Sequence, residues 1–100
     1  MDPSIGKALF KRCDDVAVVM GSLSHPTRLK VLCSLMAGEK TVGELTAICQ
    51  ISQPAMSQFL IRMKEDGMVT SNKEERKVYY KISDKRLLKL LVAIKENYCG

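Results

Sequence analysis

The sequence has no long apolar run and no segment typical of exported proteins. No apolar stretch approaches the roughly 20 residues that a membrane-spanning helix needs. The opening residues, MDPSIGKALFKRCDD, carry acidic side chains and lack the apolar core of a signal peptide. These absences predict a cytoplasmic protein with no membrane partner, in which cysteines stay reduced and form no structural disulfide framework.

Patterns typical of metal sites and enzymes are also missing. The four cysteines, Cys13, Cys33, Cys49 and Cys99, include no C-x-x-C pair, and none has a nearby histidine. The only histidine, His25, stands at a predicted helix start, where we expect it to cap or pack and not to bind a metal. We therefore predict no metal site, no cofactor and no catalytic residue, and we disfavour a thiol enzyme.

What the sequence does contain is enough apolar surface for one folded domain. Its 100 residues, 46% apolar and 27% charged, predict a single domain over residues 1–100 with one hydrophobic core. The net charge is +5, and a dimer would carry twice as much. An excess of positive charge permits nucleic-acid binding without proving it.

Apolar residues at helical spacing organise the first half of the chain. They predict a first amphipathic helix over about residues 4–22 and a second that begins near Pro26. The segment TVGEL is a capping box, in which Thr41 and Glu44 satisfy each other's free amides, and it opens a short helix to about Cys49.

A longer helix follows after about three residues, over about 53–66, with Ser52 as its N-cap. A short and a longer helix at this spacing are typical of a helix-turn-helix. The longer helix turns polar side chains outward: glutamine can bond adenine, serine can hold phosphate, and arginine can bind guanine or phosphate. A merely solvated helix face would look similar. We predict contacts with double-stranded DNA from five residues: Ser52, Gln53, Ser57, Gln58 and Arg62.

The pattern then changes from helical to alternating. Strand-like alternation over Lys77–Ile82, preceded by the charged segment NKEER, predicts a β-hairpin over about 68–82. Lys73, Arg76 and Lys77 are candidate contacts to phosphates or the minor groove. A charge run of this kind is more often a solvated loop, so the hairpin only supports the DNA interpretation.

The last predicted helix covers about residues 84–98 and is capped by Ser83 and Asp84. Its apolar stripe is wider than a small monomer needs. Together with the helix over 4–22, it is predicted to form a homodimer interface. The fold class is mainly α with a small β-hairpin, a winged helix-turn-helix.

Three segments resemble the ArsR/SmtB family of bacterial winged-helix repressors: LSHPTRLKVLCSLMAGEKTVGEL, ISQPAMSQFLIRMKEDGMV and KVYYKIS. The resemblance runs from about Val18 to the C-terminus. It implies a homodimer, a recognition helix at Gln53–Asp66, a wing at Met68–Ile82 and release of operator DNA when an inducer is sensed. The chain departs from the family pattern at Phe59, where the family often has histidine.

The metal sites known in this family do not match the chain. Arsenic sensors carry a Cys-Val-Cys pattern in the short helix, where this chain has GELTAIC with a single thiol. The zinc site on the last helix keeps Asp84, but Arg86, Asn97 and Gly100 occupy its other positions. Arginine cannot ligate a cation. Neither zinc nor arsenic is therefore expected at these sites.

Two cysteines match a different subgroup of the family. Cys33 in RLKVLCSL and Cys99 in YCG resemble the two-cysteine arrangement of the BigR, SqrR and HlyU regulators. The resemblance implies that these two thiols sense persulfides, polysulfides or oxidants and so control a repressor. Two alternatives stay open: a metal-responsive repressor with an unfamiliar site built from Cys13, Cys49 or Cys99, and a winged-helix module that binds protein.

Overall fold

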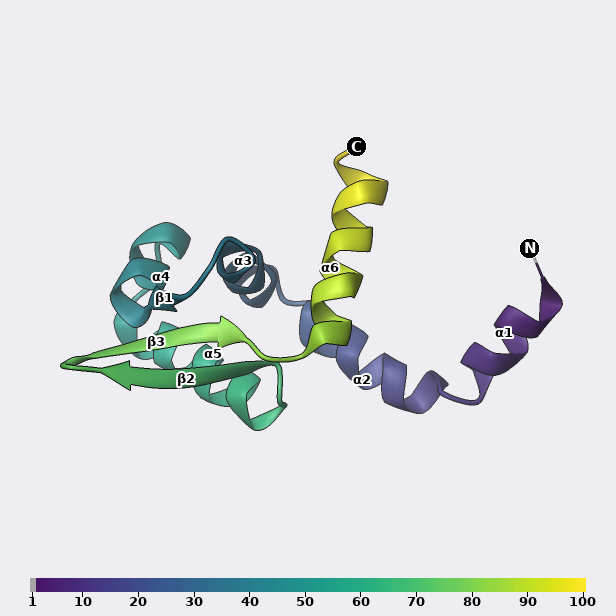
Figure 1. The fold of residues 1–100 in the computed structure, drawn as a ribbon, viewed down its shortest axis with the longest axis horizontal. Coiled ribbons are helices and arrows are strands. Elements are labelled where there is room, and N and C mark those ends of the chain that lie inside the picture. Colours follow the sequence, from purple (N-terminus) through teal and green to yellow (C-terminus); the bar gives the residue numbers. More distant parts are fainter. Residues whose placement is uncertain (1) are drawn as a thin grey trace.

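Residues 2–100 are described by a computed structural model with six helices and three strands (Figure 1). This mainly helical chain with a small antiparallel sheet confirms the fold class predicted from the sequence. Within these residues, no helix has both the length and the apolar character needed to cross a membrane. In chain order the elements are α1 (Pro3–Phe10), α2 (Cys13–Leu23), α3 (Pro26–Leu35), β1 (Lys40–Thr41), α4 (Val42–Cys49), α5 (Gln53–Glu65), β2 (Val69–Glu74), β3 (Lys77–Ile82) and α6 (Lys85–Tyr98).

The hydrophobic core lies where α3, α4 and α5 meet. Leu87 and Leu91 bring the first half of α6 onto the same core. Burying an aliphatic side chain of this size stabilises a fold by about 1.5–3 kcal/mol. The core therefore fixes α5 against α3 and α4. The side chains with almost no exposed surface come from these three helices: Val31, Leu32, Leu45, Met56, Leu60 and Met63.

The predicted hairpin is present, with a shorter turn than expected. β2 and β3 pair antiparallel, with Val69 opposite Ile82 and Glu74 opposite Lys77. Only two residues join the strands, and Glu75 adopts a left-handed φ of 57°. The segment NKEER is therefore not a loop throughout, because its first three residues continue β2.

A third strand, β1, was not predicted. Lys40 pairs with Tyr80 and Thr41 with Tyr79, which gives the strand order β1-β3-β2. A strand of two residues has no periodicity to detect in the sequence. It ties the start of α4 to the hairpin.

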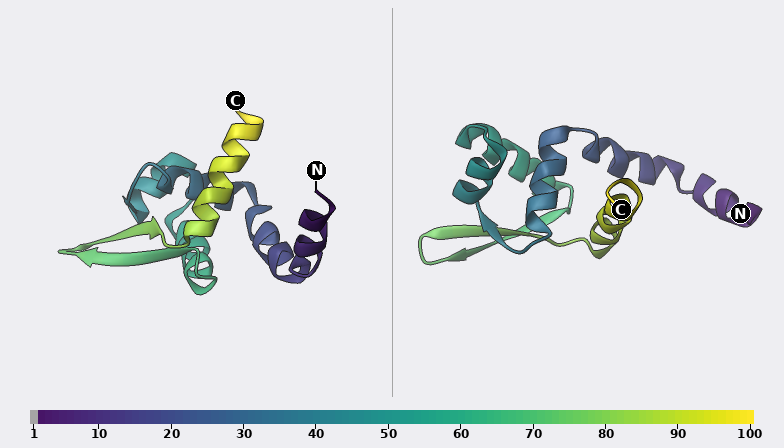
Figure 2. Two further views of the ribbon diagram at one scale, coloured as in Figure 1. Left: turned by 45° about the vertical axis from the view of Figure 1, so that its right-hand side comes forward. Right: turned by 90° about the horizontal axis from the view of Figure 1, so that it is seen from above.

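The prediction of one helix over residues 4–22 was wrong, because the chain breaks into α1 and α2. Arg12 leaves the helical region at φ −113° and ψ 11° and becomes the N-cap residue of α2. Asp14 and Asp15 lie in the first turn of α2, where negative charge stabilises a helix start. Figures 1 and 2 show α1 and the hairpin at opposite ends of the molecule.

Candidate functional site

Helix caps define the start of α4 and the turn from α4 to α5. The Thr41 hydroxyl accepts from the Glu44 amide at 3.1 Å, and the Glu44 carboxylate accepts from the Thr41 amide at 2.9 Å. The hydrogen bond that the Glu44 carboxylate accepts from the Thr41 amide lowers the pKa of Glu44. Gln50 ends α4 in the left-handed conformation (φ 55°), and Ser52 then accepts from the Ala55 amide at 3.3 Å to begin α5. The predicted capping box and N-cap are both confirmed.

The α5 helix divides into a buried and an exposed face. Met56, Leu60 and Met63 point into the core, as the spacing predicts. Among the predicted contact residues, Ser52, Gln53, Gln58 and Arg62 are exposed, and Ser57 is half-buried. All five predicted contact residues therefore lie on α5 or at its N-cap.

Arg62 has an intramolecular partner that was not predicted from the sequence. Its Nε lies 3.4 Å from Oδ2 of Asp66, one turn later. The Arg62 side chain keeps 68% of its surface exposed. An exposed pair at this spacing contributes only about 0.3–0.5 kcal/mol, so the guanidinium can leave it for another anion.

The hairpin carries the other predicted contacts. Lys73, Arg76 and Lys77 are all exposed, near or within the turn. Figure 1 shows the hairpin running beside α5, with its tip projecting beyond the helices.

One side-chain contact links the hairpin to α5. Nζ of Lys64 donates to Oγ of Ser71 on β2 at 2.7 Å. This contact could not be predicted from the sequence, because the two residues lie in elements whose relative placement depends on the fold. Lys64 thus helps to set the direction of the hairpin relative to α5.

His25 acts as a cap and a packing residue, as expected. Its Nδ1 accepts from the Thr27 amide at 3.1 Å, which requires a ring without a proton on that nitrogen. The ring also packs on Phe59, with centroids 4.9 Å apart and planes inclined by 55°. His25 therefore joins the start of α3 to α5, and Phe59 is directed towards His25 and the core.

The four cysteines are free thiols in different surroundings. Cys13, Cys33 and Cys99 are exposed, and Cys49 is half-buried. Cys33 lies on α3, and Cys99 caps the C-terminal end of α6. Figure 1 shows this end of α6 standing clear of α3.

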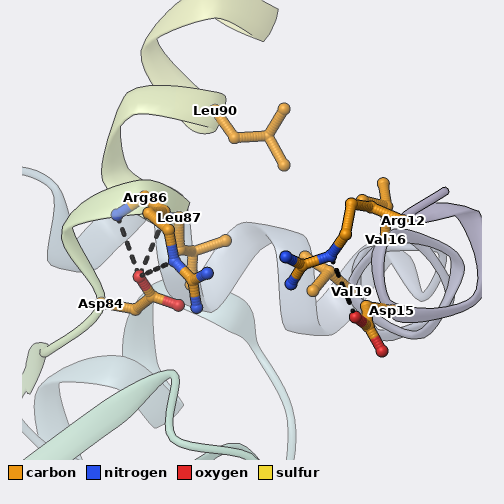
Figure 3. Close-up of a pocket in the computed structure, with 8 residues that line it drawn as sticks. All are labelled: Arg12, Asp15, Val16, Val19, Asp84, Arg86, Leu87 and Leu90. Carbon is orange, nitrogen blue, oxygen red and sulfur yellow. Dashed lines mark hydrogen bonds and ion pairs between the residues drawn. The ribbon is translucent and has the colours of Figure 1, made fainter. Parts of the chain in front are cut away.

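A cavity of about 380 Å³ lies between α2 and α6 (Figure 3). One ion pair stands on each side, with Arg12 and Asp15 3.2 Å apart and Arg86 and Asp84 3.6 Å apart. Its floor is apolar, which suits it to receive apolar side chains. Its lining residues are Arg12, Asp15, Val16, Val19, Asp84, Arg86, Leu87 and Leu90.

Asp84 is used as a helix cap. Its Oδ1 accepts from the amides of Arg86 at 2.9 Å and Leu87 at 3.4 Å. Over residues 2–100, no group of three or more histidine, cysteine or acidic side chains is placed to hold a metal ion.

Comparison with known proteins places this geometry in a family. Residues 25–71 match the family described as bacterial regulatory protein, arsR family. The biofilm growth-associated repressor of Agrobacterium fabrum is 36% identical over 93 residues, which cover 93% of this chain and 80% of that protein. The solved structure of the repressor BigR from Xylella fastidiosa matches with a TM-score of 0.87 at 33% identity, over 94% of this chain and 96% of that one. Reduced HlyU from Vibrio cholerae matches with a TM-score of 0.84 at 30% identity, over 94% and 99% of the two chains.

The matches to the Agrobacterium relative and to the two solved structures extend over nearly the whole chain, whereas the family match ends at residue 71. They confirm the winged-helix architecture and the family resemblance seen in the sequence. The matched proteins are transcriptional repressors and regulators and not enzymes. The chain therefore belongs to the ArsR family, as a winged-helix transcriptional regulator of the BigR/HlyU subgroup.

Proposed function

We propose that the chain is a homodimeric repressor that binds operator DNA and releases it when Cys33 and Cys99 react with reactive sulfur species or oxidants. α5 is the recognition helix in the major groove, and the β2–β3 hairpin is the wing. The observation that carries the proposal is the α4–α5 arrangement, in which two caps and a three-residue turn present a polar helix face beside a basic hairpin.

Charge and hydrogen-bonding groups support the DNA contacts. Gln53 and Gln58 are exposed on α5 and can bond adenine edges, while Arg62 can bind guanine or phosphate. Lys73 and Arg76 on the hairpin can neutralise phosphates beyond the groove that α5 occupies. The net charge of +5 per chain adds a long-range attraction for DNA.

Apolar side chains left exposed on the helices at the N- and C-terminal ends of the chain support the dimer. Phe10 on α1 is 80% exposed and Val18 on α2 is 71% exposed. Leu88 and Val92 on α6 also face solvent. A second copy that covered these side chains would remove them from water, at about 25 cal/mol per Å² of apolar area. The cavity between α2 and α6 offers a place for side chains of that copy.

The exposure of Cys33 and Cys99 supports their sensing role, since an accessible thiolate is the reactive form of cysteine. The relative HlyU from Vibrio cholerae was solved in a reduced form. In the proposed dimer, a sulfur bridge between Cys33 and Cys99 would tie α3 to α6. Because α6 forms part of the dimer interface, the bridge would change the separation of the two recognition helices from the roughly 34 Å of one duplex turn. A coupling of about 1–3 kcal/mol would be enough to release the DNA.

The test begins with selection of a duplex from a random library by the reduced protein. We expect an inverted repeat with half-sites one turn apart. Sodium tetrasulfide should then weaken binding of this duplex, and peptide mapping should find sulfur bridges at Cys33 that include Cys99. Cys13→Ser is the matched control and should respond like the unaltered protein. Release of DNA by Cys33→Ser at the same dose would overturn the sensing role, while absence of any selected duplex would overturn DNA binding.

A further inference from the structure

A groove on the surface between α3 and α4 contains two of the four thiols. Cys33 and Cys49 both line this groove, which has a volume of about 460 Å³. Leu29 from α3 and Ile48 from α4 make its walls largely apolar. The core holds these two helices against each other, and both thiols line the groove in the folded chain. The C-terminal end of α6, which Cys99 caps, stands apart from α3 and α4 (Figure 1).

The two thiols differ in their access to solvent. Cys33 is exposed, whereas Cys49 is half-buried, and this burial raises the pKa of the Cys49 thiol. Lys30 also lines the groove, one helical turn before Cys33, and its ammonium partly offsets the effect of burial on Cys49. A cation here also attracts an anionic reagent. The groove thus combines an accessible thiol, a second thiol and a positive charge.

We propose that Cys49 is a second partner of Cys33, so that the α3–α4 groove is a dithiol site that takes up sulfur from inorganic polysulfide. This inference rests on the proposed function, because it concerns the same inducer and the same first thiol. It differs from the proposed function in the second thiol, which is Cys49 in the groove and not Cys99.

The chemistry is balanced without a further oxidant. For a hydrogen polysulfide of three sulfurs, the Cys33 thiolate attacks the central sulfur. One S–S bond of the polysulfide breaks, hydrosulfide leaves, and Cys33 carries two added sulfurs. The Cys49 thiolate then attacks the nearer added sulfur and expels a second hydrosulfide, which leaves a trisulfide between the two residues. The two thiols lose two electrons and their protons, and the polysulfide is reduced to two hydrosulfides. Both thiols line one groove, so the second step is intramolecular, which favours it despite the raised pKa of Cys49.

The position of Cys49 gives this bridge a short path to the proposed DNA interface. Cys49 is the last residue of α4, and only Gln50 and Ile51 separate it from Ser52, which caps α5. A bridge that pulls the end of α4 towards α3 acts directly on the left-handed turn at Gln50. The direction of α5 then changes within each protomer, before any change at the dimer interface.

The experiment uses the full-length reduced protein, sodium tetrasulfide, and the duplex selected as above. Cys99→Ser leaves Cys49 as the partner in the groove, and Cys49→Ser leaves Cys99. Cys49→Ala repeats the test made with Cys49→Ser, in case a serine at this half-buried position disturbs packing. Cys13→Ser is the matched control. Each protein is mapped for sulfur-bridged peptides without reduction, and its DNA affinity is measured before and after treatment.

We expect Cys99→Ser to form a Cys33–Cys49 bridge and to lose affinity by about 5- to 150-fold, the usual range of coupling between two sites. If Cys99→Ser forms no bridge while Cys49→Ser joins Cys33 to Cys99, the inference is overturned and the proposed function stands. If the Cys49 bridge forms but neither Cys49 variant joins Cys33 to Cys99, the inference is supported and the proposed role of Cys99 fails. If no protein forms a bridge or releases DNA, both fail.

Discussion

Arg62 offers a sharp test of the proposed DNA interface, because its side chain must leave one anion to reach another. Its Nε lies 3.4 Å from the Asp66 carboxylate, and this pair contributes about 0.3–0.5 kcal/mol. A contact from arginine to guanine contributes about 1–3 kcal/mol. The difference gives a net contribution of roughly 0.5–2.7 kcal/mol for each recognition helix. Arg62→Ala should therefore weaken DNA binding by that amount per half-site.

Asp66→Asn should have the opposite effect. The substitution removes the competing carboxylate and leaves Arg62 free, so binding should tighten by about twofold per half-site, the equivalent of the pair energy. Glu65→Gln is the matched control. It removes the same charge from the neighbouring residue. Among residues 2–100, the ion pair of Arg62 is with Asp66 and not with Glu65. The difference between the two variants isolates the pairing from the general loss of negative charge.

Fluorescence anisotropy with the selected duplex, repeated over a series of salt concentrations, provides the measurement. If Arg62 contacts a phosphate, Arg62→Ala should lower the salt slope by about one. If it reads a base, the slope should change less and one base position should lose specificity. An Arg62→Ala protein that is folded by circular dichroism and binds as tightly as the unaltered chain would refute the placement of α5 in the groove.

Three further predictions concern the fold around the site. Because the pKa of Glu44 is lowered, the capping bond that its carboxylate accepts stabilises the fold at pH values above the ordinary glutamate pKa. This stability is lost as the pH falls through the lowered pKa. Thermal unfolding should show the loss in the unaltered chain and a smaller loss in Glu44→Gln. His25→Ala should lower the free energy of unfolding in urea by about 1 kcal/mol through the lost cap, plus a contribution from the Phe59 contact, and His25→Asn should recover only the cap. Leu88→Asp should convert the proposed dimer to monomers in sedimentation, whereas a dimer that persists would place the interface elsewhere.

Local patterns predicted most of the helices and strands. The Thr41–Glu44 capping box, the Ser52 cap and the alternation over Lys77–Ile82 each act within a few residues, so the sequence is sufficient to recognise them. The break at Arg12 was missed because apolar spacing continues on both sides of it and carries no sign of a short interruption. β1 was missed because it exists only through pairing with β3.

The candidate site divides in the same way. The exposed residues of α5 follow from helical periodicity once the buried face is known. The shared groove of Cys33 and Cys49 could not be predicted in this way. The two residues lie 16 positions apart in the sequence, and only the packing of α3 on α4 brings them to one groove. The contact of Lys64 with Ser71 likewise depends on how β2 returns along α5.

The N-terminal helix α1 has a consequence for how the proposed dimer assembles. α1 has eight residues and none of them is buried. Isolated helices shorter than about 12–15 residues are marginal in water, because nucleation is unfavourable and few bonds offset it. α1 therefore needs the surface of a second copy to persist, so its folding is coupled to association. Diluting the protein below its dimerisation constant should then lower the helical signal in circular dichroism while the core of α3, α4 and α5 stays folded.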